Sequence, residues 1–254
     1  MIINQHSITG TKCLLLGGNG FIGKHVCQEL LFSGADVTVL GRTPNFVGVD
    51  VQYHNVDLYK SELLVPYFQD IDVVICLAPS SLPATSNSNI ENEITSHVKS
   101  TVKLAEIASE MGVKKFIFVS SGGTVYGENS EIFLTEKSVT WPISAYGVSK
   151  RAIESYLDII AQNTGMKVIS LRISNPYGLD QDGSRGQGII AALLDSLTTS
   201  KKIEIWGDGS NVRDYIHVTD AASPGSICYM NIVCLLYTSP SPRDQRGSRM
   251  PSSA

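Results

Sequence analysis

Short apolar runs alternate with longer amphipathic stretches along most of the chain. Runs of strand length lie at residues 13–16, 36–40, 73–77, 116–119 and 168–171. Apolar residues recur at helical spacing between them, most clearly at residues 90–111 and 145–162. Strands that alternate with helices predict parallel strands joined by right-handed crossovers. The pattern therefore predicts an α/β fold with a Rossmann-type, doubly wound parallel sheet over residues 1–172.

The pattern changes after residue 172. A loop rich in Gly, Asp and Arg covers residues 178–188, and a helix at 189–197 and a short strand at 203–205 follow it. We interpret residues 173–222 as part of a second, smaller domain that binds substrate and is interleaved with the first. Residues 223–233 receive no assignment.

The last stretch, residues 234–254, is rich in Ser, Pro and Arg and lacks apolar periodicity. Its back-translation matches the read-through of a transposase-type sequencing adapter near both ends, whereas a disordered natural tail is the alternative. We expect this stretch to be non-native and to take no part in the core. Ser223, Pro224 and Gly225 interrupt a helix that should grow from Thr219. The chain is accordingly expected to be an incomplete part of a longer enzyme.

Composition narrows the possible partners. Hydrophobic residues make up 43% of the chain, charged residues 17%, and the net charge is −4. Without a basic stripe, we expect no nucleic-acid partner. No apolar run approaches the roughly 20 residues of a membrane span, so no membrane partner is expected. The N-terminus has no charged segment followed by an apolar one, so secretion is not expected, and we assign the cytoplasm. The 5 cysteines form no C-x-x-C pair, so neither a disulfide framework nor a metal site is expected.

A glycine-rich turn follows the first apolar run. Gly17, Gly20 and Gly23 form G-x-x-G-x-x-G between a strand and a helix. Such glycines permit a tight turn and let backbone amides approach a pyrophosphate at the positive end of the helix. The turn therefore predicts dinucleotide binding.

The end of the second predicted strand bears on which dinucleotide binds. An acid there usually accepts hydrogen bonds from the adenosine ribose, but the strand ends in Gly41 and Arg42. NAD is the expected cofactor, and NADP stays open because Arg42 suits a phosphate. Asp57, after the third strand, is a candidate partner for the adenine amino group, with a solvated loop aspartate as the alternative.

Tyr146 and Lys150 lie four residues apart on a predicted helix and so share one face. A tyrosine needs its pKa lowered by about 3 units from about 10 to act as a base at neutral pH. A nearby Lys, a cationic nicotinamide ring and a helix N-terminus would each favour the phenolate. Together with the glycine turn, the pair predicts acid/base chemistry beside a bound dinucleotide.

Five motifs follow one another in the chain, at residues 17–23, 120–127 (SSGGTVYG), 146–150 (YGVSK), 175–178 (NPYG) and 213–217 (RDYIH). In this order they resemble the extended short-chain dehydrogenase/reductase superfamily. Within it, the chain is most similar to the NAD-dependent epimerase/dehydratase family of the UDP-glucose 4-epimerase type, from about Lys12 to Asp220.

The resemblance implies a reaction and a set of site residues. A tyrosine would remove the proton of the sugar 4-hydroxyl while hydride passes from C4 to the nicotinamide, and the 4-keto sugar would turn over and take the hydride back. Lys150 would hold the nicotinamide ribose. The implied cofactor contacts also include Phe21, Ile22, Leu58, Leu77, Ala78 and Tyr177. The implied contacts to a UDP-sugar, or a related nucleotide-sugar, are Asn175, Gln187, Trp206 and Arg213.

One position departs from the family. Its assisting hydroxyl normally lies where this chain has Gly122, so Ser121 or Thr124 must substitute. Gly123 and Thr124 also replace the Asp-Glu pair of relatives that dehydrate the sugar, which counts against a 4,6-dehydratase.

Three functions remain in competition. The first is 4-epimerisation of a nucleoside-diphosphate sugar, and the second is one-way NAD(P)-dependent reduction or oxidation of such a sugar. The third is a non-catalytic NAD(P)-binding regulator. The resemblance also implies a homodimer formed through the helix that bears Tyr146, where Ile153, Tyr156 and Ile160 offer apolar surface that could equally serve the domain's own core.

Overall fold

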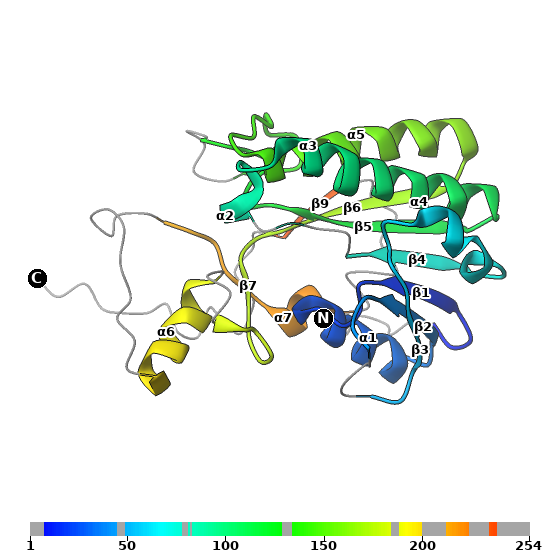
Figure 1. Ribbon diagram of the computed structural model, residues 1–254, viewed down its shortest axis with the longest axis horizontal. Helices are drawn as coiled ribbons and strands as arrows, with labels where there is room; N and C mark the ends of the chain where they lie inside the picture. The colour runs from blue at the N-terminus through cyan, green and yellow to red at the C-terminus, as the bar shows by residue number, and fades with distance from the viewer. Residues whose placement is uncertain are drawn as a thin grey trace, which may run out of the picture.

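The computed structural model describes residues 8–44, 49–77, 81, 83–128, 134–183, 188–199, 212–223 and 234–237. These residues form a three-layer α/β domain and a small lobe beside it (Figure 1). The predicted fold class is therefore correct. The expected strand at residues 203–205 lies outside the described residues.

A single parallel sheet forms the middle layer. Its strands are β1 (Lys12–Leu16), β2 (Asp36–Gly41), β3 (Gln52–Asn55), β4 (Val73–Cys76), β5 (Lys115–Ser121), β6 (Lys167–Ile173) and β9 (Cys234–Tyr237). Their order is β3-β2-β1-β4-β5-β6-β9, and every neighbouring pair is parallel. The chain thus builds outward from β1 in both directions, as a doubly wound sheet does.

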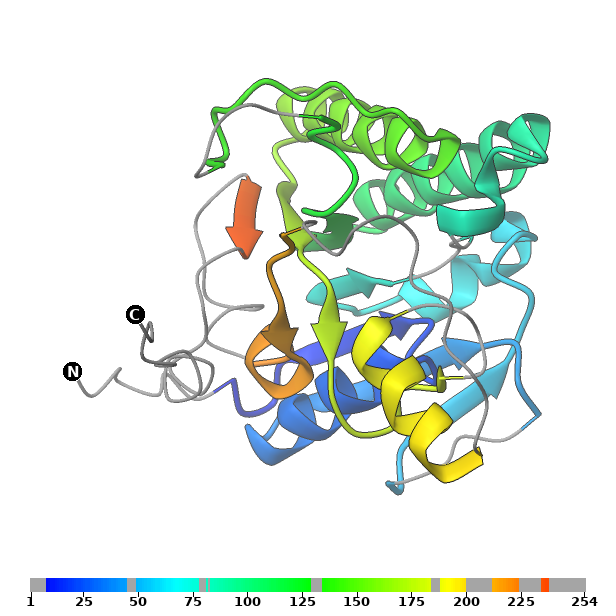
Figure 2. The ribbon, with the colours of Figure 1, turned by 90° about the vertical axis from the view of Figure 1, so that its left-hand side faces the viewer.

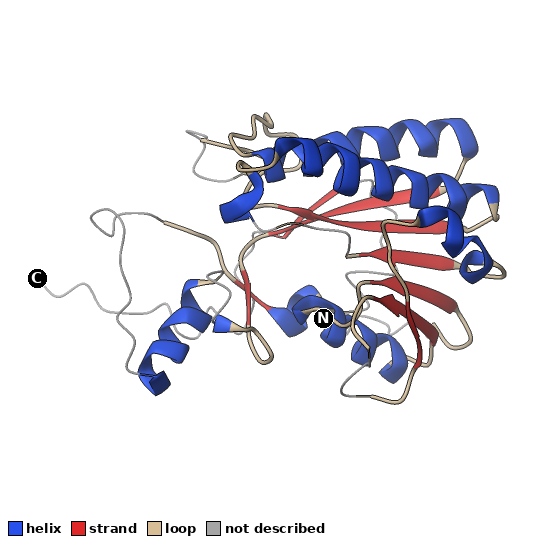
Figure 3. Ribbon diagram, in the orientation of Figure 1, coloured by secondary structure: helices blue, strands red, loops and turns tan. Residues whose placement is uncertain are grey.

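Helices cover both faces of this sheet (Figure 3). One face carries the 3-10 helix η1 (Ser61–Phe68), α4 (Lys99–Glu110) and α5 (Ala145–Thr164). The other face carries α1 (Phe21–Phe32) and the short α7 (Val218–Ala221). Short helices α2 (Pro83–Ser86) and α3 (Ile90–Asn92) precede a π-helix, η2 (Glu93–Val98), which leads into α4.

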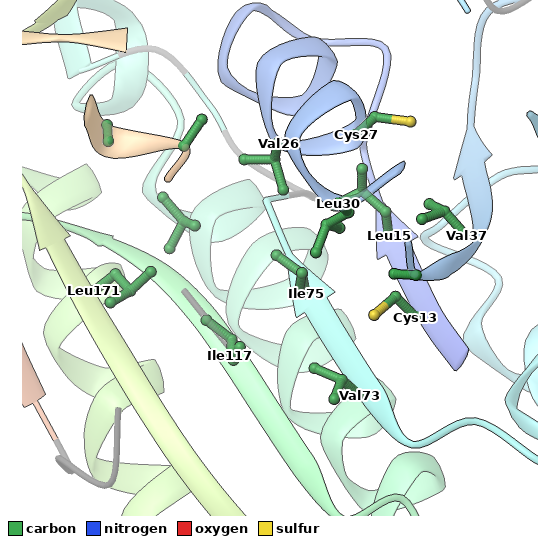
Figure 4. Close-up of a cluster of buried hydrophobic side chains, with 14 of the residues drawn as sticks. Cys13, Leu15, Val26, Cys27, Leu30, Val37, Val73, Ile75, Ile117 and Leu171 are labelled. Atoms are coloured by element: carbon green, nitrogen blue, oxygen red, sulfur yellow. The ribbon is translucent and has the colours of Figure 1, made fainter. Parts of the chain in front are cut away.

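The pleat of β1 divides the core into two clusters. Cys13 and Leu15 face α1, whereas Leu14 and Leu16 face α4 and α5, because successive side chains of a strand point to opposite faces. On the α1 side, Val26 and Leu30 of the helix lie over the sheet, in one cluster with Leu15 and Ile75 (Figure 4). Since both faces are buried, the strands show continuous apolar runs instead of alternation.

The small lobe follows β6. It consists of the two-stranded parallel pair β7 (Pro176–Tyr177) and β8 (Ile216–His217) together with α6 (Ile189–Thr199). Figure 2 shows β7 and β8 side by side, with α6 next to β7. Residues from positions 176–217 therefore gather at one end of the main sheet.

Two elements differ from the sequence expectation. The expected helix over residues 90–111 is divided by the π-helical turn at Glu93–Val98, which the apolar spacing does not reveal. Cys234–Tyr237, expected to stay outside the fold, pairs in parallel with β6. The physical reason is that CLLY is an apolar segment of strand length, and an edge strand offers it unpaired backbone groups. The adapter origin of residues 234–254 stays a prediction.

Within the described part of the chain, no helix is both long and apolar enough to cross a membrane. The same residues contain no cluster of His, Cys, Asp or Glu with the geometry of a metal site.

Candidate functional site

The candidate residues gather at the carboxyl ends of the parallel strands. Gly17 follows β1, Leu77 follows β4, and Ser121 ends β5. Arg42 and Asp57 follow β2 and β3 at the same edge. Because the chain leaves β1 toward opposite sides of the sheet, a crevice is expected outside this edge, where doubly wound proteins bind their ligands.

Each glycine of the turn suits its position for a different physical reason. Gly17 has a φ of +84° and donates its N–H to the Leu40 carbonyl at 2.8 Å. A Cβ at Gly23 would lie 2.6 Å from the Gly17 oxygen, so only glycine lets α1 approach β1 this closely. Gly20 precedes α1 and offers no side chain to cap its amides. Phe21 and Ile22 begin the helix, and its first N–H groups point into the turn that would hold a pyrophosphate.

Tyr53 lies against the end of β2, where the sequence has Gly41 instead of an acid. A Cβ at Gly41 would lie 2.9 Å from the Tyr53 hydroxyl, which occupies the space that an acidic side chain would need. That hydroxyl donates to the Thr43 carbonyl at 2.6 Å. The side-chain amide of Asn19, from the glycine turn, also hydrogen-bonds to Thr43. The end of β2 is therefore tied to the glycine turn through neutral polar groups.

Arg42 is exposed and lies over the ring of Tyr59, with its Cζ 5.3 Å from the ring centroid. Burial raises the pKa of Tyr59, while the Arg42 charge opposes that rise. The guanidinium is thus held beside an aromatic ring at the same edge, with its outer side accessible to solvent.

The other residues expected to contact the cofactor differ in whether their side chains are exposed or buried. The carboxylate of Asp57 accepts a hydrogen bond from the Tyr59 amide at 3.1 Å and is exposed. The side chain of Leu58 belongs to the core, so only its backbone faces the edge. Leu77 is half-buried, and its amide donates to the Leu16 carbonyl beside the glycine turn. Ala78 lies outside the described residues.

Local contacts fix the start of α5 next to the loop that follows β5. Ser144 caps the helix by accepting from the Gly147 amide at 3.2 Å, and Ala145 donates to the side chain of Asn87 at 2.7 Å. A Cβ at Gly147 would lie 2.6 Å from the Thr124 carbonyl oxygen. Tyr146, half-buried, is thereby held against the segment that contains Thr124.

Lys150 is buried although it carries a charge. The residue is only 5% exposed, and Nζ donates to the Val119 carbonyl at 2.8 Å. The same Nζ lies 5.5 Å from the ring centroid of Tyr146 and 4.7 Å from that of Phe118. A cation placed next to a phenol favours its ionised form, which is the electrostatic condition for a tyrosine base.

Both candidate assisting hydroxyls lie between β5 and α5. Ser121 ends β5 and is half-buried, and the amide of Gly122 donates to the Ile173 carbonyl on β6. The Thr124 hydroxyl oxygen is buried and has no hydrogen-bond partner among the described residues. A buried hydroxyl without a partner is costly.

The expected substrate contacts come from the small lobe. Asn175 is exposed, and its amide donates to the Asp214 carbonyl at 2.8 Å. Its Oδ1 would lie 3.7 Å from a Cβ at Gly123, so the lobe meets the loop after β5. Tyr177 contacts the rings of Tyr215 and His217 edge-on. Arg213 is exposed, while Gln187 and Trp206 lie outside the described residues.

Glu93 and His97 also lie beside Tyr146 and Lys150, although the sequence did not mark them as candidate site residues. Both are buried, their side chains lie 3.8 Å apart, and they line a small cavity together with Tyr146 and Lys150. Burial lowers the pKa of His97, against the raising effect of the Glu93 carboxylate. Their spacing of four on a helical run was a visible signal, but nothing in the sequence indicated that this face turns inward.

One of the three residues expected to offer apolar surface for a dimer is buried within the domain instead. Ile153 is 2% exposed and belongs to the core beneath α5, whereas Tyr156 is 49% exposed on the outer face of the helix. Burial in the domain's own core is thus the correct alternative for Ile153.

Comparison with known proteins gives a consistent assignment. The model of the NAD dependent epimerase/dehydratase family matches residues 13–224. A putative UDP-glucose 4-epimerase of Methanocaldococcus jannaschii is 31% identical, over 82% of this chain and 70% of its own length. A dTDP-4-dehydro-6-deoxyglucose reductase of Escherichia coli is 34% identical, over 82% of this chain and 69% of its own length.

Solved structures agree with the sequence relatives. UDP-glucose 4-epimerase from Thermotoga maritima, with UDP-glucose, has a TM-score of 0.78 at 32% identity, covering 84% of this chain and 71% of its own. The UDP-glucose 4-epimerase of Thermus thermophilus, in complex with NAD, has a TM-score of 0.78 at 28% identity, covering 91% of this chain and 78% of its own. The chain therefore belongs to the NAD dependent epimerase/dehydratase family.

Proposed function

We propose that this chain carries the NAD-binding and acid/base part of a nucleoside-diphosphate-sugar 4-epimerase. The observation that supports it best is the pairing of Tyr146 with the buried ammonium of Lys150, at the edge of the sheet where the glycine turn lies. This edge fits a dinucleotide because the positive φ of Gly17 and the missing side chain of Gly20 leave backbone amides accessible.

In the proposed reaction, the edge formed by the glycine turn would hold NAD, which would supply a reversible acceptor for the hydride at C4 of the sugar. Tyr146, as phenolate, takes the proton of the 4-hydroxyl as the C4–H bond breaks, and it gives that proton back when the 4-keto sugar is reduced. Lys150 favours the phenolate and orients the nicotinamide ribose. Both the hydride and the proton return to the sugar within one cycle, so no external oxidant or reductant is consumed.

Two hydroxyls are candidates to hold the 4-oxygen during this proton transfer. The Thr124 hydroxyl oxygen is buried without a partner among the described residues, which favours it over Ser121 as the group that awaits a ligand. Either one would donate a hydrogen bond to the oxygen as negative charge develops there.

The small lobe would bind the rest of the nucleotide-sugar. Asn175 would contact the sugar-nucleotide, Tyr177 would lie near the nicotinamide, and Arg213 would bind the diphosphate. Arg213 is exposed and forms only a contact to the Val212 carbonyl in the described structure, so its guanidinium is accessible to an anion. Gln187 and Trp206 stay predictions from the sequence.

A one-way reductase is the second candidate. It is favoured by the absence of an acid at Gly41, where the Tyr53 hydroxyl fills the space, and by the exposed Arg42 beside the cofactor edge. The similarity to a dTDP-4-dehydro-6-deoxyglucose reductase supports the same alternative. Such an enzyme would consume reduced cofactor in proportion to product, whereas an epimerase leaves the cofactor balance unchanged.

The test is conversion of UDP-galactose into UDP-glucose, with N-acetyl and uronate forms assayed in parallel. The chain covers about 70% of the length of the curated relative from Methanocaldococcus jannaschii, and the assay uses the chain as it stands. We expect turnover without net change in cofactor absorbance. Tyr146→Phe should lower kcat by about 100-fold to 10,000-fold, the usual contribution of general acid/base catalysis.

Tyr156→Phe is the matched control. It also removes a tyrosine hydroxyl from α5, but at a position that is 49% exposed on the outer face, so turnover should stay unchanged. Undiminished turnover in Tyr146→Phe would refute the mechanism. Stoichiometric cofactor consumption would favour the reductase, and cofactor binding without turnover of any of these sugars would favour a regulator.

A further inference from the structure

A buried polar network lies directly beneath the Tyr146–Lys150 pair. Glu154 accepts hydrogen bonds from Ser120 Oγ at 2.5 Å, from Arg172 Nε at 3.0 Å and from Arg172 Nη2 at 2.7 Å. Arg172 Nη1 also donates to the Tyr126 hydroxyl at 2.8 Å, which in turn donates to the Thr135 carbonyl at 3.0 Å. Ser120, Tyr126, Glu154 and Arg172 are each at most 5% exposed.

The network touches every segment that carries a proposed acid/base group. Glu154 lies one helical turn after Lys150 on the inner face of α5. Ser120 lies between Val119, whose carbonyl accepts from Lys150, and Ser121. Tyr126 belongs to the loop that contains Thr124, so a single set of contacts joins α5, the end of β5 and that loop.

Packing alone gives no reason for ions at this place. Removing an arginine and a glutamate from water is costly, and a well-packed apolar pair in their stead often stabilises a fold equally well. Arg151 lies 3.7 Å from Glu154 but is partly exposed, so the bidentate contact with Arg172 is the one that fixes the geometry. An ion pair with two hydrogen bonds in fixed directions defines both the register and the rotation of α5 on the sheet.

We infer that the Glu154–Arg172 pair and Ser120 are positioning residues, which set the placement of Lys150 and Tyr146 relative to the hydroxyls after β5. This inference rests on the proposed function. The Ser120–Glu154 hydrogen bond joins the end of β5 to α5 next to the Lys150–Val119 hydrogen bond. If this connection is lost, Lys150 and Tyr146 lose their fixed position relative to the end of β5 and the hydroxyls that follow it, although the core of α5 stays packed.

The experiment removes the uncharged ends of the network, because deleting Glu154 or Arg172 alone would leave a lone buried charge and unfold the protein. Ser120→Ala removes a donor to Glu154, and Tyr126→Phe removes an acceptor of Arg172. Ser155→Ala is the matched control, since it also removes a serine hydroxyl, but from the exposed face of α5. The double variant E154M/R172M removes both charges together.

Two readouts separate positioning from stability. The first is kcat against KM, together with the melting temperature. Ser120→Ala should lower kcat about tenfold at nearly unchanged KM, as displaced catalytic groups do. The second is the distance from Lys150 Nζ to the Val119 carbonyl in crystal structures of the variants, which does not require turnover. We expect this 2.8 Å hydrogen bond to be lost in Ser120→Ala and Tyr126→Phe but kept in Ser155→Ala.

The groups that face Tyr146 across the small cavity are Glu93, His97 and Lys150, and none of these variants changes them. If the melting temperature falls while kcat and the Lys150–Val119 hydrogen bond stay as in the unaltered protein, the network is purely structural and the inference is wrong. Full activity in a folded E154M/R172M protein would also overturn it. If the unaltered protein has no epimerase activity, the proposed function fails, and the Lys150–Val119 distance still decides the positioning role.

Discussion

Helices α5 and α6 represent two regions of the molecule that are built differently. α5 spans 20 residues, and its inner face contributes Ile153, Glu154 and Leu157 to the interior. α6 spans 11 residues, and only Ala191 is buried among its described side chains. Leu197 on α6 is 80% exposed, whereas Leu157 on α5 is fully covered. Among the described residues, α5 thus packs into a closed core, whereas most of α6 is exposed or half-buried.

This difference separates chemistry from recognition. The groups proposed for proton transfer lie on a packed helix and a central strand, where neighbouring contacts fix their positions. The groups proposed to hold the nucleotide-sugar, such as Asn175 and Arg213, are exposed on the lobe. Binding residues on loops over a rigid scaffold vary readily between relatives, which agrees with relatives that carry the names of an epimerase and a reductase.

The largest expected difference in stability comes from replacing a leucine by alanine on each of the two helices. Leu157→Ala should lower the free energy of unfolding by about 2–5 kcal/mol, because it opens a cavity in a closed core. Leu197→Ala should change it by less than about 0.5 kcal/mol, as exposed substitutions usually do. Urea unfolding of both variants measures the contrast. Equal losses would mean that α6 is packed as tightly as α5.

The glycine turn allows a similar contrast at one ligand site. Gly23→Ala should cost about 1–3 kcal/mol of stability through overpacking, because its Cβ would meet backbone atoms of Gly17 and Gly18. Gly20→Ala should leave the stability nearly unchanged, since its Cβ would lie 3.4 Å from the Gly17 oxygen, and should mainly weaken NAD binding. Thermal unfolding and NAD titration of both variants provide the test. A fully stable Gly23→Ala protein would contradict the packing argument.

Most of the main sheet could be predicted from the sequence, but less of the site could. Continuous apolar runs indicated β1, β4, β5 and β6 because both faces of these strands are buried. The glycine turn and the Tyr146–Lys150 spacing are local patterns, and therefore visible in the chain itself. The contact of Glu154 with Arg172 depends on the packing of α5 against β6, and the blocking of Gly41 by Tyr53 depends on strand pairing. Such contacts between distant residues leave no periodic signal.

The buried His97 predicts a pH dependence of stability in the main domain. Burial lowers its pKa below the ordinary value of 6.5, so the unfolded chain binds more protons than the folded one between these two pKa values. Stability should therefore rise with pH up to about 6.5 and level off above it. His97→Gln should flatten this rise in urea unfolding measured at several pH values. An unchanged slope would show that another group causes the dependence.

The smallest expected effect concerns the choice of cofactor. Arg42→Ala should leave NAD affinity within about twofold and weaken NADP binding by up to about fivefold, the range of an exposed ion pair. Titration with each dinucleotide measures the ratio, and salt should reduce the difference. An equal loss for both cofactors would assign Arg42 to the shared part of the dinucleotide.

Reversible hydride transfer at C4, with Tyr146 as the base, is tested most directly with UDP-galactose labelled with deuterium at C4. The UDP-glucose formed is analysed by nuclear magnetic resonance. Deuterium should stay at C4, because the hydride returns to the carbon from which it came. Loss of the label to solvent, or its accumulation on the cofactor, would show that the hydride does not return to C4.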